Sequence, residues 1–327
     1  MLRRKTSGSP LSSALKIVVS VGLLVYVLYH VGWRETWQTI RAASPAYLVA
    51  ALALDLLAIP VRAYRWQALL EAIGVRVGLA RLTGLYFVGT FFSDFLPTGV
   101  GGDVVRAYEL AEQTQNSAAA VGTVLVDRAT GLLMLFLIAS FSLLFSHSLV
   151  SPQIAWVILL LTAVSWGGSI FLVRRDWLER LGLWRSVARF RSLEKVYECV
   201  RACGARVVGK ALGVSLVLNV LLICLNYLIA LALGVRVSLW YFFLFVPIIS
   251  FLLVLPVSLS GWGLRQGGYV YLFSQAGVSA QAALTLALIV QFFQLAIGLI
   301  GAVIYATEGI RGFRAASRGQ RSRKGEG

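Results

Sequence analysis

Two short segments of this sequence place a proline, glycines and an arginine inside otherwise apolar runs. The residues there that could do chemistry are Pro97, Gly101, Gly102, Asp103 and Arg106 in the first segment, and Pro256, Gly261, Gly263 and Arg265 in the second. Because proline lacks an amide proton and clashes with the preceding turn, each segment predicts one helix that ends and another that begins. Free amides at a helix start favour an anion, and arginine holds phosphate through two parallel hydrogen bonds. The residue types therefore predict an anion site, with phosphate as the first candidate.

The two segments repeat each other. A Leu-Pro pair, a glycine and an arginine recur, and 159 residues separate the two prolines and also the two arginines. Broken helices at matching positions of two halves point to a binding site near the midplane of a transporter. We therefore expect Arg106 and Arg265 on the first turn of helices that meet near the membrane centre. A structural role is the alternative, in which these arginines reach the interface or pair with Asp94 and Asp103.

Other ionisable residues also lie inside apolar runs, namely Asp55, Asp127 and Arg128. Neighbours in sequence project about 100° apart on a helix, so Asp127 and Arg128 are expected to find partners on other helices. As intramembrane charges they are candidates, together with Asp94, for a gate or for counter-ions of a substrate. A purely structural ion pair is the equal alternative.

Two groups of residues predict contacts with the membrane surface. Arg62, Arg65 and Trp66 share one helix face at the end of an apolar run, which is typical of an interfacial anchor. The basic segment 174–210 contains, at 177–200, aromatic and aliphatic residues at helical spacing with arginines between them. This pattern predicts a helix on an anionic inner leaflet and argues against a nucleic-acid partner.

The composition requires lipid as the solvent for most of the chain. Of the 327 residues, 58% are hydrophobic and only 13% are charged, and the mean hydropathy is +0.80, which excludes an ordinary soluble domain. Runs long enough to cross about 30 Å of hydrocarbon occur at 14–32, 46–63, 118–146, 152–173, 211–233 and 280–306. Two shorter apolar stretches, at 82–96 and 239–255, each run into a proline.

The distribution of arginine and lysine predicts the topology. If all these stretches crossed completely, the basic segment 174–210 would lie outside the cell, against the positive-inside rule. If 82–112 and 239–277 instead enter the membrane and return to the same side, the basic tails 1–13 and 311–327 and this segment are all cytoplasmic. The sequence thus predicts an all-α polytopic membrane protein with six full spans and two re-entrant hairpins in an inverted repeat. Eight full spans are the alternative.

The remaining features predict neither an enzyme nor a cofactor. The three cysteines have no zinc-type spacing, and the sequence contains no nucleophile-elbow, phosphate-loop or metalloprotease motif. The net charge of +16 is concentrated between and beyond the apolar runs, so it reports orientation. We expect one membrane domain at 14–310, with halves at 14–147 and 152–310, in the cell (inner) membrane.

Several of these residues, in this order, resemble one known family. The matching motifs are Arg62-x-x-Arg65-Trp66, Phe91-Phe92 followed by Leu96-Pro97, Gly101-Gly102-Asp103-x-x-Arg106, Val126-Asp127-Arg128, and Pro256 followed by Gly261-x-Gly263-x-Arg265. Together they resemble the transmembrane, flippase-like domain of lysylphosphatidylglycerol synthases over roughly 14–310. Because the soluble aminoacyl-transferring domain is not in this sequence, the resemblance does not imply synthase activity. Gln266 stands where that pattern leads us to expect an acid, which argues against coupling through a carboxylate there.

The resemblance and the motifs together predict a lipid translocase. Its substrate would be an anionic lipid, such as a phospholipid or a polyprenyl-phosphate-linked lipid, held by the helix starts with Arg106 and Arg265. A small-solute or ion transporter of the same architecture is one alternative. The others are a non-catalytic subunit that docks a lipid synthase or glycosyltransferase through 174–210, and an intramembrane transferase.

Overall fold

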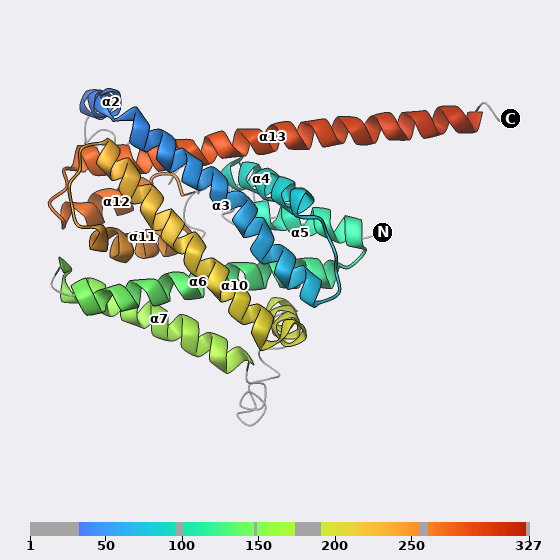
Figure 1. The fold of residues 1–327 in the computed structure, drawn as a ribbon, viewed down its shortest axis with the longest axis horizontal. Coiled ribbons are helices and arrows are strands. Elements are labelled where there is room, and N and C mark those ends of the chain that lie inside the picture. Colours follow the sequence, from blue (N-terminus) through green and yellow to red (C-terminus); the bar gives the residue numbers. More distant parts are fainter. Residues whose placement is uncertain (1–32, 96–100, 147–148, 174–190, 255–260, 325–327) are drawn as a thin grey trace, which may run out of the picture.

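The computed structural model describes residues 33–95, 101–146, 149–173, 191–254 and 261–324, and every longer element in these ranges is a helix. The helices are α2 (Trp33–Ala42), α3 (Pro45–Ala72), α4 (Leu79–Phe95), α5 (Gly101–Thr114), α6 (Ser117–Ser146), α7 (Pro152–Val173), α10 (Arg191–Ala232), α11 (Leu239–Val254), α12 (Leu264–Ser274) and α13 (Ala280–Lys324). The expected all-helical polytopic membrane protein is therefore confirmed (Figure 1).

Five of the described helices are long and apolar enough to cross a bilayer, and they are α3, α6, α7, α10 and α13. They coincide with the spans that the apolar runs predict from residue 46 onward. The first predicted span, 14–32, lies outside the described residues.

The four remaining apolar or partly apolar helices form two pairs, α4 with α5 and α11 with α12. Within the described residues none is longer than 17 residues, whereas a full crossing needs about 20. The two pairs lie toward opposite ends of α3 and α10 (Figure 1). These lengths match the expected hairpins, and the predicted breaks at Pro97 and Pro256 fall between the paired helices, outside the described residues.

The internal repeat is visible where α3 and α10 end. Residues 74–77 and 234–237 both read Gly-Val-Arg-Val. Gly74 and Gly234 adopt left-handed backbone angles, with φ of +81° and +73°. In both turns the amide of the next valine donates to a carbonyl five residues earlier, at 2.9 Å. Such a glycine-closed turn is the Schellman motif, so the two halves share local structure as well as sequence.

The two halves point in opposite directions. The amide of Ser44, before α3, donates to the carbonyl of Ala232, at the end of α10, over 2.8 Å. At the other end the thiol of Cys203 in α10 donates to the carbonyl of Leu69 in α3 over 3.6 Å. Because α3 and α10 are equivalent helices that pack antiparallel, the repeat is inverted, as the two short motifs predict. Each hairpin also packs against the last span of the other half, α4 on α13 and α11 on α6.

The described end of the basic segment 174–210 is helical. Residues 191–203 are already helical, and Gly204 breaks α10 with φ of +73°. Cys199 and Cys203 are buried against Leu69 and Val126, so the described end of this segment packs on protein. The helix expected at 177–200 lies mostly outside the described residues, and its contact with the inner leaflet stays a prediction.

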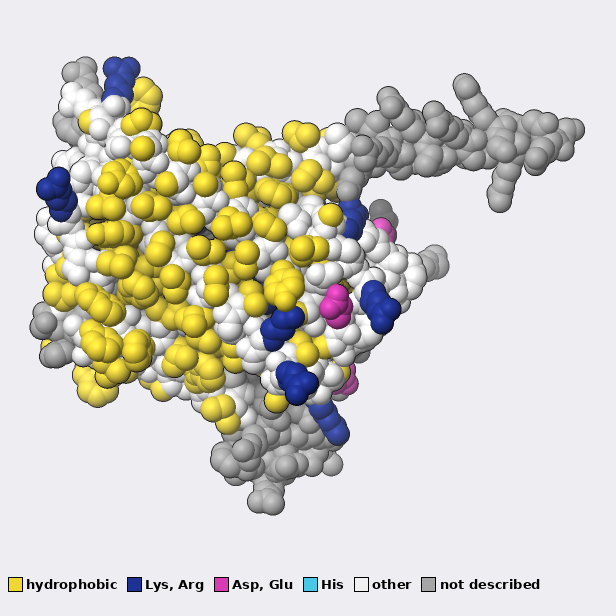
Figure 2. Space-filling model, viewed as in Figure 1, with side chains coloured by type: hydrophobic (Ala, Val, Ile, Leu, Met, Phe, Trp, Pro, Cys, Tyr) yellow, Lys and Arg dark blue, Asp and Glu magenta, His cyan; other side chains and the backbone are white. Residues whose placement is uncertain are grey.

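The surface is that of a protein immersed in lipid. Hydrophobic side chains cover the left and centre of the face shown in Figure 2, while charged side chains lie toward its two ends. Large apolar side chains on the outside include Trp156, Leu160 and Val164 of α7. Since α7 contributes few buried residues, its packing partner over most of its surface is hydrocarbon.

The inverted repeat predicts opposite sidedness for two residues of identical motif. Arg76 and Arg236 are both exposed, and inversion places them on opposite faces of the membrane. Arg236→Cys should react with a membrane-impermeant maleimide added to intact cells, whereas Arg76→Cys should react only after permeabilisation. The parent protein gives the background of its own cysteines. Labelling of both variants from the same side would contradict the inverted topology.

Candidate functional site

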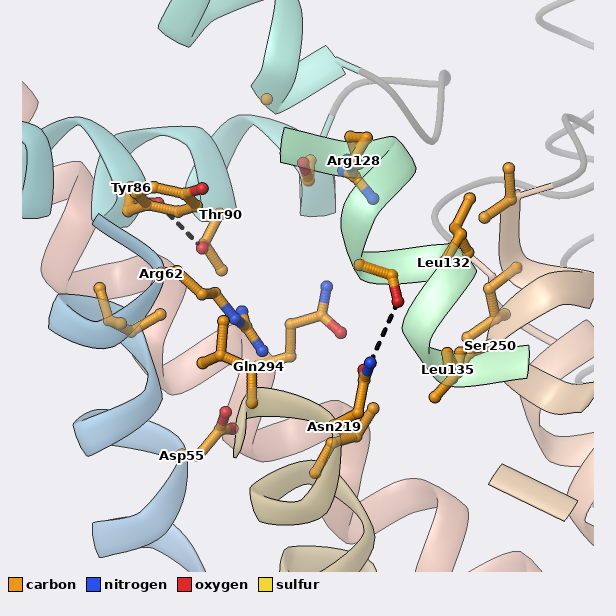
Figure 3. A pocket seen from close by; sticks show the side chains of 18 of the residues that line it. Asp55, Arg62, Tyr86, Thr90, Arg128, Leu132, Leu135, Asn219, Ser250 and Gln294 are labelled. Atoms are coloured by element: carbon orange, nitrogen blue, oxygen red, sulfur yellow. Dashed lines mark hydrogen bonds between the residues drawn. The ribbon is translucent and has the colours of Figure 1, made fainter. Parts of the chain in front are cut away.

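A cavity of about 390 Å³ lies between the two halves and is lined by α3 to α6 and α10 to α13 (Figure 3). Its lining combines polar and apolar residues. The charged members are Asp55, Arg62, Arg65, Asp103, Arg106, Asp127, Arg128 and Arg265. The sequence motifs of both halves therefore converge on one space, including both arginines proposed as substrate ligands.

A buried ion pair joins three helices of the first half to α10. The Nε atom of Arg65 donates to Oδ1 of Asp127 over 2.7 Å, and the hydroxyl of Tyr86 donates to Oδ2. Arg65 also donates through Nη1 to the hydroxyl of Ser215 in α10 over 2.7 Å. A desolvated pair is stable only when further hydrogen bonds satisfy it, and these partners do so.

The interfacial role expected for Arg65 and Trp66 is wrong. Arg65 is 7% exposed and Trp66 is fully buried, and the indole of Trp66 donates to the hydroxyl of Thr123 over 3.0 Å. Arg62, one turn earlier on α3, faces the cavity (Figure 3). The helical spacing of the three residues is as expected, but the face they share points toward protein and cavity.

Arg106 lies at the centre of the first-half cluster. Its Nη2 atom is 2.5 Å from Oδ1 of Asp103 and 3.9 Å from Oδ2 of Asp127. The guanidinium also lies over the ring of Tyr86, 3.9 Å from the centroid, and 5.0 Å from that of Trp66. Aromatic faces attract such a cation. In α5 as described, Arg106 is in the second turn, one turn further along than the motif predicts.

Asp103 connects this cluster to Arg128 of α6. The second carboxylate oxygen of Asp103 accepts a hydrogen bond from the Nε atom of Arg128. Asp127 and Arg128 thus find partners on α3, α4 and α5, and not each other, as their 100° separation predicts. The pairing of Arg106 with Asp103 that we gave as a structural alternative is also present.

The glycines of the two breaks act differently. Gly102 lies in the first turn of α5, and a side chain there would overlap the carbonyl oxygen of Gly89 in α4. Gly101 is buried beside it. Gly102 thus permits close packing of α5 on α4, whereas Gly261 and Gly263 adopt left-handed angles, with φ of +79° and +77°. Of these four glycines, only the second pair has the left-handed backbone that favours glycine.

In the second half a chain of amide contacts replaces the ion pairs. Arg265 of α12 donates through Nη2 to Oε1 of Gln294 in α13 over 2.8 Å, and Gln294 donates to Oδ1 of Asp94 in α4 over 2.9 Å. Asp94 is therefore linked to Arg265 through an amide. Gln294 is a component that the motifs missed, although a glutamine inside an apolar span is a visible signal.

Gln266 caps α12. It is fully buried, and its Oε1 atom accepts the amide proton of Gly263 over 2.8 Å. This contact is the reciprocal half of a capping box. The residue that stands in place of the expected acid thus has a structural function, and it occupies one of the amides that we expected to be free for an anion.

Two buried guanidinium nitrogens in the cavity wall have no acceptor among the residues that the structure describes. They are Nη1 of Arg106 and Nε of Arg265, on residues that are only 4% and 8% exposed. A buried donor without an acceptor costs about 1–3 kcal/mol. Because one such donor comes from each half, the arrangement is suited to an anion bound between them.

Part of the cavity wall is apolar. Its walls include Leu132 and Leu135 of α6, Leu222 of α10, and Ile249 and Leu253 of α11. Figure 3 shows Leu132 and Leu135 beside Ser250, on the side away from Asp55 and Arg62. A cationic end and an apolar wall in one space fit an amphiphile.

Comparison with known proteins agrees with the motif resemblance. A family model described as "Lysylphosphatidylglycerol synthase TM region" matches residues 13–302. Two proteins of Methanothermobacter thermautotrophicus, each named "UPF0104 membrane protein", are 25% and 24% identical to this chain; the matches cover 89% of it and 95% and 92% of those proteins. A UPF0104 membrane protein of Methanocaldococcus jannaschii is 22% identical over 36% of this chain and 35% of its own length.

Loss of the buried pair of Arg65 and Asp127 should lower the free energy of unfolding more than loss of a partly exposed pair. Asp127→Asn leaves Arg65 buried without a carboxylate, so the free energy of unfolding should fall by about 3 kcal/mol or more. Titration of the detergent-solubilised protein with sodium dodecyl sulfate measures it. Glu109→Gln is the matched control, because Glu109 lies 3.8 Å from Arg81 at a partly exposed site and should lose at most about 1 kcal/mol. Equal losses in both variants would contradict the assigned pair.

Proposed function

Because this chain belongs to the family of the lysylphosphatidylglycerol synthase transmembrane region, we propose that it is a lipid translocase that moves an anionic, phosphate-bearing lipid between leaflets. One observation carries the proposal. Buried arginines from both inverted halves, Arg106 and Arg265, line one cavity, and each has a donor nitrogen for which the described part of the chain supplies no acceptor. The substrate's anionic group supplies the acceptor that these nitrogens lack.

The charge of the cavity supports an anion. Its lining has five arginines against three aspartates, which leaves two formal positive charges. Charges at membrane depth are costly and are retained where they have partners or bind a substrate. Phosphate matches because it is anionic and accepts two parallel bonds from one guanidinium.

The apolar wall supports a lipid over a water-soluble solute. A lipid bound with its phosphate at the arginines has chains that need an apolar path, and α6, α10 and α11 supply one. A purely polar solute would leave these leucines and isoleucines against water. The small-solute transporter is the alternative, and the exchange assay described below distinguishes it from a lipid translocase. In the proposed function the lipid leaves the protein chemically unchanged.

The inverted repeat supplies the mechanism of the proposed transport. The first half is tied by the ion pairs of Arg65, Asp127, Asp103 and Arg128, while Arg265 of the second half is held by neutral Gln294. Rocking of one half against the other exposes a midplane site to each leaflet in turn. The first-half hairpin then moves as one body, and the weaker contacts of Arg265 rearrange.

The orientation follows from the basic residues. We place the ends of α3 and α10 that carry Arg76, Arg206 and Lys210 at the cytoplasm, because basic loops stay inside. The two termini are then cytoplasmic in a cell membrane. A lipid-modifying enzyme docked on 174–210 is a proposed partner, since that segment lies on the same side.

A leaflet-exchange assay tests the proposal. Purified protein is reconstituted into vesicles with a fluorescent phosphatidic acid or phosphatidylglycerol, and dithionite quenches the outer leaflet. With the wild type, dithionite should quench more than the outer-leaflet fraction of the fluorescence, because lipid from the inner leaflet reaches the outer leaflet. Arg106→Gln and Arg265→Gln should slow exchange about tenfold or more, because each removes a charge-assisted contact.

Arg236→Gln is the control, since it removes an exposed arginine far from the cavity lining. Its exchange rate should equal that of the wild type. Quenching limited to the outer leaflet with every anionic lipid, in vesicles that accumulate a water-soluble anion, would replace the lipid proposal with the small-solute alternative.

A further inference from the structure

Two charged residues of the cavity make neither an ion pair nor a hydrogen bond within the described part of the chain. Arg65, Arg106 and Arg128 each contact a carboxylate, and Arg265 contacts Gln294. Arg62 and Asp55, in contrast, have no hydrogen bond and no ion pair among the described residues. Both nevertheless line the cavity, as Gln294 does (Figure 3).

Asp55 lies where its carboxylate attracts arginines from both halves. Asp55 and Arg62 are seven residues apart on α3, which is two helical turns and therefore the same face. The carboxylate of Asp55 interacts electrostatically with Arg62 and, across the cavity, with Arg265 of α12. Neither interaction is a direct contact. A group that accepts hydrogen bonds from both arginines would therefore gain contacts that Asp55 does not make.

The repeat shows that this arrangement belongs to one half only. The residues 160 positions further on, the spacing between the two Gly-Val-Arg-Val turns, are Ser215 and Leu222. Ser215 is bound to Arg65. The charged face of α3 has thus no counterpart on α10, and a packing role common to the repeat does not explain it.

We propose that Arg62 is a further anion-binding residue of this cavity, and that Asp55 is the protein's own counter-anion, with which the phosphate of an incoming lipid competes for Arg62 and Arg265. The proposal rests on the translocase function and names the groups that regulate occupancy of its site. Competition lowers affinity for the lipid and so favours its release, which a translocase requires. Removal of Asp55 should therefore tighten binding, whereas removal of any arginine weakens it.

Direct binding of dodecyl phosphate to the full-length protein, in a neutral maltoside detergent, tests this. Isothermal titration calorimetry should give a dissociation constant about tenfold smaller for Asp55→Asn than for the wild type, and about tenfold larger for Arg62→Gln, the size of one charge-assisted contact. Glu112→Gln and Arg76→Gln change the same charges on exposed residues outside the cavity, and both should bind like the wild type. Asp55→Ser, which copies Ser215, serves as the second neutral variant if Asp55→Asn does not fold.

The result that overturns the proposal is unchanged or weaker binding in the folded Asp55 variants, or wild-type binding in Arg62→Gln. A titration with inorganic phosphate separates a lipid from a free anion. Affinity equal to that for dodecyl phosphate would overturn the lipid as the competitor. If the variants show the predicted binding pattern but the wild type exchanges no lipid between leaflets, only the proposed transport is rejected. If the wild type exchanges lipid and Asp55→Asn binds like the wild type, only the role proposed for Asp55 is rejected.

Discussion

The cost of holding five arginines inside a membrane protein is the constraint on which the rest of this structure depends. A guanidinium in hydrocarbon needs a carboxylate, polar side chains or a water-filled space. Asp127 and Asp103 supply carboxylates from two helices, and Tyr86 and Ser215 complete the hydrogen bonds. The short helices α5 and α12 begin beside this space, and broken backbone at membrane depth must also face protein or a cavity. The arginines, the hairpins and the cavity are therefore one arrangement.

The inverted repeat places two unlike halves around that cavity. In the first half the ion pairs and the close packing of Gly102 on Gly89 join α3 to α6 into one body. In the second half Arg265 is held by an amide chain through Gln294. Equivalent backbones thus carry different chemistry, in which strong pairs stabilise one half and weaker, exchangeable contacts hold the arginine of the other. This asymmetry suits the alternating mechanism that we propose for a site shared between the halves.

Much of this arrangement follows from the sequence, because lipid imposes simple rules. Apolar length predicts the spans from residue 46 onward and the short helices α4 and α11, and the angle between Asp127 and Arg128 predicts their separate partners. The predicted environment of Arg65 and Trp66 is wrong. The sequence around an arginine near the end of a span is the same whether its side chain faces lipid headgroups or a carboxylate on another helix. The sequence also does not predict the link from Arg265 to Asp94 through Gln294. Several polar residues lie inside apolar runs, and only the tertiary packing decides which of them are in contact. The repeated Gly-Val-Arg-Val segments, in contrast, indicate the internal repeat directly from the sequence.

We propose that an anionic lipid occupies the cavity between the halves. Photocrosslinking with a phosphatidic acid that carries a diazirine in its acyl chain, followed by mass-spectrometric mapping of the labelled residues, tests it most directly. The account predicts label on the cavity wall of α6 and α11, at residues such as Leu132, Leu135 and Leu253, and loss of that label in Arg265→Gln. Label confined to the lipid-facing surface of α7 and the other spans, and unchanged in that variant, would contradict it.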